Sequence, residues 1–128
     1  HGELNGERAA RYLNVSDLMP TFKDIQSIAA EQIVLAGDYD SGLAVANRAV
    51  GLESATRGDA RAWWARGEAA YQLGLAEDAL LSFETSLARG NTGRYAVASH
   101  RGLAFLAEEA GNPEESAEHH AKADALDR

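Results

Sequence analysis

Three glycines recur at one fixed interval along this chain: Gly37, Gly74 and Gly111 follow one another at a spacing of 37 residues. After each glycine comes a short segment with at least one acidic residue, and then an alanine-rich amphipathic run. Glycine commonly ends a helix, so the pattern predicts a helical hairpin that is repeated along the chain. A chain of 128 residues can build one continuous core from such units if they stack on each other.

Helical periodicity dominates the sequence, and no alternating run of β-branched residues indicates a strand. We therefore expect an all-α fold made of three pairs of helices. Glycine-rich or polar connectors at 51–58 and 89–94 separate the pairs. The expected helices cover residues 22–36, 40–52, 60–73, 76–88 and 95–110, and a last one starts at 113.

Residues that favour helix starts precede three of these helices. Thr21, with Asp24 three residues later, fits the beginning of the first. Asp59 is a good N-cap for the helix that starts at residue 60. Asn112 fits the N-cap of the last helix, because Pro113 then occupies the first helical position, where a missing N–H costs little.

The first 21 residues do not share the repeat. Leu4, Ala9, Tyr12 and Leu13 predict a short leading helix, which we expect to cover the exposed face of the first pair, as the end of a repeat array requires. The predicted organisation is therefore a capping segment at 1–21 and three repeats at about 22–58, 59–95 and 96–128.

Composition excludes several classes of partner. The formal net charge is −8 at pH 7, which argues against a nucleic-acid partner, because phosphate binding needs clustered Lys and Arg. No cysteine is present, so disulfides and thiolate metal sites are excluded, and we expect a cytoplasmic location. No apolar stretch is long enough to insert into a membrane. Since the chain begins with His1, we expect a domain or a processed piece of a longer protein.

The repeat resembles the tetratricopeptide repeat (TPR), a helical-repeat family. The second copy carries the resemblance best, through Trp63, Gly67, Tyr71, Gly74, Ala79, Phe83, Ser86 and Leu87. The resemblance implies three hairpins stacked in a right-handed superhelix, a solenoid, with Gly67 and Ala79 where paired helices cross closely. Residues that it places in the core are Trp63, Tyr71, Leu80, Phe83, Leu87 and Leu103. The spacing of 37 residues exceeds the roughly 34 that are usual in the family.

By the same resemblance, the first helix of each hairpin lines a concave groove that binds a peptide or helix of a partner protein. The candidate groove residues are Ser27, Glu31, Arg61, Trp64, Glu68, Tyr71, Arg101, Phe105 and Glu108. We expect Trp64 in the groove beside Tyr71 and Phe105, with Trp63 in the core. Alternatively, these aromatic side chains pack between helices or under the N-terminal segment. Acidic residues outnumber Arg61 and Arg101 among the groove positions, which favours a ligand with apolar anchors and basic residues.

No pattern indicates a catalytic centre. Glu115 and His119 have the i,i+4 spacing of metal ligands and His120 is adjacent, but a third ligand of comparable quality is missing, so we expect a solvated helix face without a metal. His100 and Ser99 are neighbours in sequence and point apart on a helix, so they do not form a catalytic pair. We also expect no cofactor.

The sequence thus predicts a non-catalytic interaction module, a scaffold or adaptor for protein binding. A second hypothesis stays open. The chain is then a regulatory or oligomerisation domain of a larger enzyme or signalling protein, and it forms a homo-oligomer through an uncapped end.

Overall fold

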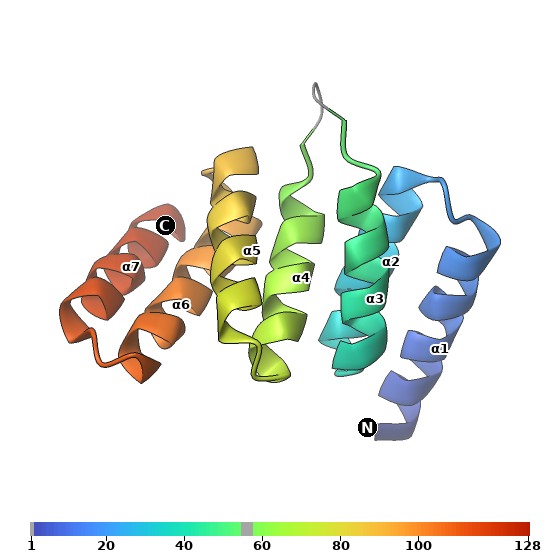
Figure 1. Cartoon of the computed structure of the whole chain (residues 1–128), viewed down its shortest axis with the longest axis horizontal. Coiled ribbons are helices and arrows are strands. Elements are labelled where there is room, and N and C mark those ends of the chain that lie inside the picture. The colour runs from blue at the N-terminus through green and yellow to red at the C-terminus, as the bar shows by residue number, and fades with distance from the viewer. Residues whose placement is uncertain (1, 55–57) are drawn as a thin grey trace.

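The computed structural model describes residues 2–54 and 58–128 of the chain. Residues 55–57, in the middle of the expected connector at 51–58, lie outside the described residues. Helices account for most of the described part, which confirms the expected all-α fold (Figure 1). In chain order the helices are α1 (Gly2–Leu18), α2 (Lys23–Leu35), α3 (Tyr39–Gly51), α4 (Ala60–Gln72), α5 (Ala76–Arg89), α6 (Arg94–Glu109) and α7 (Pro113–Leu126).

The expected helices agree with the observed ones to within one or two residues, with one larger difference. The leading helix is not short, because α1 continues to Leu18. The start signal at Thr21 is wrong in detail. Phe22 holds the N-cap position of α2 in an extended conformation, and no side chain caps this helix. Near the third repeat, α6 begins at Arg94, just before the expected boundary at residue 95.

Two aspartates cap helices through their side chains. Asp59 accepts a hydrogen bond from the backbone N–H of Ala62 at 3.0 Å, as predicted, and Asp38 accepts one from Ser41 at 3.2 Å. Asn112 occupies the N-cap position of α7, but its side chain makes no capping hydrogen bond. The start of α7 therefore relies on the fixed backbone angle of the following proline.

The three periodic glycines end α2, α4 and α6 in the same way. Gly37, Gly74 and Gly111 have φ angles of 88°, 78° and 82°, in the left-handed region that favours glycine. Each glycine N–H donates to the carbonyl three residues earlier at 2.9–3.1 Å, and the next N–H donates to the carbonyl five residues earlier at 2.8–3.2 Å. This is the Schellman motif. The glycines that recur every 37 residues in the sequence therefore mark the same type of turn, once in each helical hairpin.

The helices form three antiparallel pairs, α2–α3, α4–α5 and α6–α7, that lie side by side in a row (Figure 1). The first helices of the pairs contact one another, since α4 packs on both α2 and α6. The second helices α3, α5 and α7 do not contact each other within the described residues. Helix α1 packs mainly on α2 at one end of the row, where its leading position was expected.

Much of the core consists of small side chains, which lets the helices approach closely. Phe83 and Leu103 are buried, as predicted. Tyr71 and Leu87 are only partly buried and pack against the edge of the core. Leu80 was expected in the core but is 43% exposed, because its side of α5 faces the space between α5 and α7, which do not touch.

None of the described helices combines the length and the apolar character that crossing a membrane requires.

Candidate functional site

Five of the nine predicted groove residues meet at one hollow between α4 and α6. The hollow has a volume of about 230 Å³. Helix α4 supplies positions 64, 68, 71 and 72, and α6 supplies 98, 101, 102 and 105; the spacing of three or four residues puts each set on one helix face. The lining residues are Trp64, Glu68, Tyr71, Gln72, Ala98, Arg101, Gly102 and Phe105.

An aromatic pair forms the accessible part of this hollow. The rings of Tyr71 and Phe105 are stacked, with centroids 6.5 Å apart and an interplanar angle of 27°. Phe105 is 44% exposed, and the edge-on ring of His120 from α7 lies 5.6 Å from it. The Tyr71 hydroxyl donates to Glu109 Oε1 at 2.6 Å. This hydrogen bond, together with burial and nearby carboxylates, raises the pKa of Tyr71 to about 12.

The two tryptophans exchange the places that the sequence predicted for them. Trp64 is only 9% exposed, because the ring of Tyr95 from α6 packs 5.9 Å from its own. Trp63 is partly exposed and its Nε1 donates to Glu53 at 3.1 Å, while the Arg66 guanidinium lies 5.8 Å above its ring. Trp64 therefore forms the floor of the hollow and is not an exposed anchor.

Two further predicted groove residues, Ser27 and Glu31, have buried side chains. Ser27 donates a hydrogen bond to Asp59 at 3.0 Å. Glu31 accepts a hydrogen bond from the Tyr95 hydroxyl, and it lies 3.8 Å from Arg61 Nε. The partners of Ser27 and Glu31 come from later in the chain: Asp59 directly precedes α4, Arg61 lies on α4 and Tyr95 lies on α6.

Arg94 completes the Glu31 cluster, with its Nη2 at 3.2 Å from Glu31 Oε2. The Tyr95 hydroxyl also accepts hydrogen bonds from Arg61 at 2.8 Å and from Arg94 at 2.6 Å. Burial, followed by the hydrogen bond to Glu31, raises the pKa of Tyr95 against the opposing effect of the two arginines. Sequence reasoning missed Tyr95 and Arg94, since no local signal links them to a residue more than 60 positions earlier.

The hollow is acidic, because its arginine is neutralised by ion pairs within the molecule and its glutamates are not. Arg101 is held by the C-terminal acids, with Nη2 at 3.2 Å from Asp124 and 3.8 Å from Asp127. Glu68 accepts a hydrogen bond from Gln72 at 2.8 Å, and the exposed Glu108 lies in the last turn of α6, the helix that carries Phe105. Among the described residues, neither Glu68 nor Glu108 has a cationic partner. The aromatic pair therefore has carboxylates without countercharge beside it.

The histidines of α7 turn in different directions, which separates the candidate metal ligands. His119 Nδ1 lies 3.0 Å from Nδ1 of His100 on α6, and His119 Nε2 lies 4.0 Å from Glu115 Oε1. His120 points to Phe105 instead. Burial, followed by the nearby charges of His119 and Lys122, lowers the pKa of His100. Among the side chains that the structure describes, no three His, Cys, Asp or Glu residues are placed to hold a metal ion.

Comparison of the chain with protein-family models and with curated protein sequences finds no match.

Proposed function

We propose that this chain is a non-catalytic, TPR-type interaction module that binds a segment of a partner protein at the hollow between α4 and α6. Three hairpins with one shared glycine turn support the assignment to a repeat architecture. Contacts among α2, α4 and α6, without equivalent contacts among α3, α5 and α7 in the described part, favour a row that curves toward the first helices. In this proposal, the curvature makes a right-handed superhelix with α4 and α6 on its concave side.

The observation that carries the proposal is an aromatic pair, the exposed Phe105 and the partly buried Tyr71, beside carboxylates that lack countercharge. Phe105 and Tyr71 offer an apolar surface, and Glu68 lies at the same hollow. A lysine or arginine side chain fits this combination, because its alkyl part packs on the rings while its charge faces the carboxylate. The expected ligand therefore carries a basic residue next to an apolar one.

The Glu31 cluster restricts where the ligand lies. Tyr95 and Arg94 reach from α6 to Glu31 on α2, so the ion pairs that a ligand could make there are already used inside the molecule. Opening this cluster would leave a buried carboxylate without partners, which is costly. We therefore place the ligand on the α4–α6 half of the row and not along all three first helices.

A peptide library displayed on phage tests the proposal with the purified chain as bait. Selected peptides should share a basic residue beside an aromatic or aliphatic one, and their binding is then measured by fluorescence anisotropy. We expect Phe105→Ala to weaken binding at least about tenfold, as loss of a central aromatic anchor commonly does. Glu68→Gln should weaken it less and should reduce its dependence on salt.

Phe22→Ala provides the matched control, because Phe22 is also an exposed phenylalanine but precedes α2, outside the hollow. Circular dichroism checks that each variant is folded. If the selected peptides bind Phe105→Ala and Glu68→Gln as tightly as the unchanged chain, the binding surface lies elsewhere and the proposal is contradicted.

A further inference from the structure

A second surface is found on the outer side of α1. Leu4, Arg8, Arg11, Val15 and Leu18 follow each other at three- or four-residue steps, so they share one face of this helix. All five side chains are exposed, and Leu18 is 73% exposed. The opposite face of α1, which carries the buried Ala9 and Ser16, packs on the rest of the molecule. We call the five exposed residues the α1 stripe. It is apolar at both ends and basic in the middle.

The basic part of the α1 stripe is not used inside the molecule. Arg8 and Arg11 make no ion pair or side-chain hydrogen bond with any described residue. Elsewhere, most other arginines of the described chain are paired, including Arg48 with Asp17 at 3.3 Å and Arg89 with Glu53 at 2.9 Å. The two stripe arginines are therefore available to carboxylates outside their own chain.

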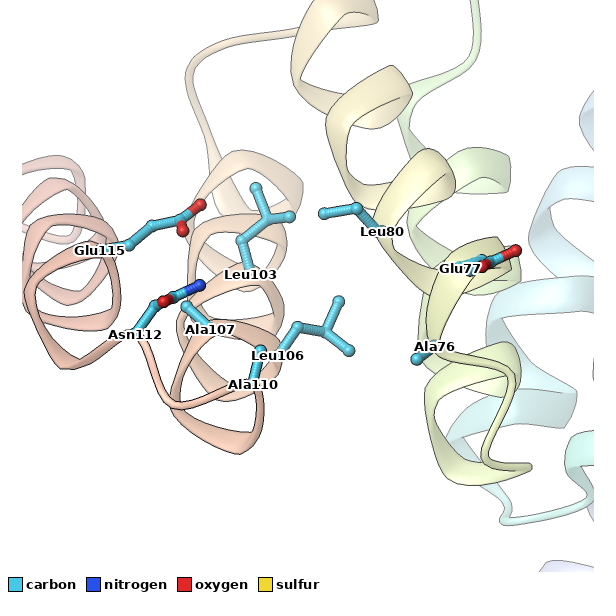
Figure 2. Close-up of a pocket in the computed structure, with 9 residues that line it drawn as sticks. All are labelled: Ala76, Glu77, Leu80, Leu103, Leu106, Ala107, Ala110, Asn112 and Glu115. Atoms are coloured by element: carbon cyan, nitrogen blue, oxygen red, sulfur yellow. The ribbon is translucent and has the colours of Figure 1, made fainter.

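An apolar cleft of about 230 Å³ lies near the other end of the molecule, between α5 and the α6–α7 pair (Figure 2). Leu80 of α5 points across the cleft toward Leu103 of α6, and Leu106 extends the same apolar surface. Glu77 of α5 and Glu115 of α7 stand at opposite rims of the cleft. Glu77 has no cationic partner in the described part of the chain.

The α1 stripe and this cleft are complementary in two respects. Both are apolar, and the arginines of the stripe match the glutamates of the rims in charge. A helix with the pattern of the stripe can therefore lie along the cleft with its apolar residues inward.

The α1 stripe cannot reach the cleft of its own molecule. Helix α1 ends the row on one side, and the cleft lies toward the opposite side, with α2, α3 and α4 between them (Figure 1). We propose that the α1 stripe of one copy docks in the cleft between α5 and α7 of the next copy. Each molecule then uses two different surfaces, a head-to-tail contact.

Burial of apolar surface supplies most of the association, because each copy carries a net charge of −8 and two copies repel each other overall. The Arg–Glu pairs then mainly fix the orientation of the docked helix. Since every molecule in such an assembly leaves one stripe and one cleft open, it grows into longer oligomers as concentration rises, unless its curvature closes a ring.

Sedimentation velocity of the purified chain tests this contact between about 1 μM and about 1 mM, the range of weak protein association. The average mass should rise with concentration. A stripe variant, Val15→Gln/Leu18→Gln, and a cleft variant, Leu80→Gln, should each stay monomeric. Glutamine forms helices well and leaves the net charge unchanged. Leu35→Gln, at an exposed leucine outside both surfaces, should associate as the unchanged chain does.

The decisive sample is an equimolar mixture of the stripe variant and the cleft variant. The intact stripe of the cleft variant can dock in the intact cleft of the stripe variant, so the mixture should form a one-to-one dimer and nothing larger. An unchanged chain that remains monomeric up to about 1 mM would overturn the proposal. The absence of a dimer in the mixture would overturn it as well, even if the unchanged chain associates.

Discussion

Gly67 of α4 lies directly against the ring of Phe83 of α5. A Cβ atom at position 67 would come within 2.7 Å of ring atoms Cδ1 and Cε1. Gly102 of α6 approaches the other edge of the same ring, where a Cβ atom would lie 2.5 Å from Cε2 and Cζ. The sequence pointed to Ala79 as the close neighbour of Gly67, but the atoms nearest to an added Cβ all belong to Phe83. One buried ring therefore sets the spacing of α4, α5 and α6.

We expect Gly67→Ala to lower the free energy of unfolding by about 1–3 kcal/mol, because the added methyl group overpacks the core against this ring. In a Phe83→Leu background the same substitution should cost less, since the smaller side chain leaves room. Urea unfolding of the four proteins measures the coupling. An equal cost in both backgrounds would show that the Phe83 ring does not restrict position 67.

Substitution of a periodic glycine should destabilise the fold through backbone strain and not through overpacking. Around Gly74 no atom lies within 4 Å of an added Cβ, so the site has space, but its φ of 78° strains any other residue. Gly74→Ala should therefore destabilise the fold by about 1–2 kcal/mol. Gly6→Ala is the control, because Gly6 is also uncrowded but lies within α1, where alanine should stabilise by about 0.5–1 kcal/mol. Thermal unfolding that shifts in the same direction for both variants would contradict this explanation.

Glu53 ties the connector after α3 to two helices. Its carboxylate accepts hydrogen bonds at 2.9 Å from Arg89 Nε, at 2.9 Å from the Asp59 N–H and at 3.1 Å from Trp63 Nε1. Burial would raise its pKa, but these hydrogen bonds, the one from Arg89 first, outweigh burial and hold the pKa below the ordinary value of 4.5. The ionised form is thus the one that the fold stabilises.

Glu53→Gln should consequently lower stability at neutral pH by about 1–2 kcal/mol, a range that allows for the partly exposed Arg89. A carboxyl group with a lowered folded pKa contributes fully above its ordinary pKa of 4.5, and the contribution disappears as the pH falls through the folded value. The gap between variant and unchanged chain should therefore narrow below about pH 4.5 in urea unfolding. Glu84→Gln, at an exposed position of α5, should show no such gap.

His100, at the contact between α6 and α7, should make the stability of the fold depend on pH in a second range. Its pKa in the folded chain lies below the ordinary value of 6.5, so the unfolded chain binds a proton more readily. Stability should thus fall as the pH drops below about 6.5, with His119 and Lys122 adding positive charge nearby and Glu115 opposing them. Thermal unfolding across pH 5 to 8, roughly the range in which histidine titrates, measures the slope, which should become smaller in His100→Gln. The same slope in both proteins would assign the effect to another group.

Tyr71 reports on the geometry of the hollow without any ligand. With its hydroxyl bonded to Glu109, its pKa is about 12. Glu109→Gln removes the charge that opposes ionisation, so the pKa should move down toward the ordinary value of 10.0. The difference in ultraviolet absorbance between this variant and Tyr71→Phe, titrated over alkaline pH, isolates the one phenol. A Tyr71 that already titrates near 10 in the unchanged chain would show that the hydrogen bond to Glu109 does not persist.

Local features of the sequence predicted most of the helices. A left-handed glycine, as at Gly74, and a capping aspartate, as at Asp59, act within one helical turn, so their effects can be read from neighbouring residues. Helix periodicity is local in the same sense. It predicts that positions 64, 68 and 71 share one face of α4 and that positions 101 and 105 share one face of α6. The 37-residue spacing thus determined the number of hairpins and where the chain turns back.

Tertiary packing decided which of these side chains remain accessible. Trp64 is covered because Tyr95, on another helix, packs on it, and Glu31 is buried because Tyr95 and Arg94 reach it from a distant part of the chain. Likewise, Leu80 stays exposed because α5 and α7 do not meet. Helix periodicity states which face a residue occupies, but the exposure of that face depends on the neighbouring helix. That neighbour is set by contacts between residues far apart in sequence.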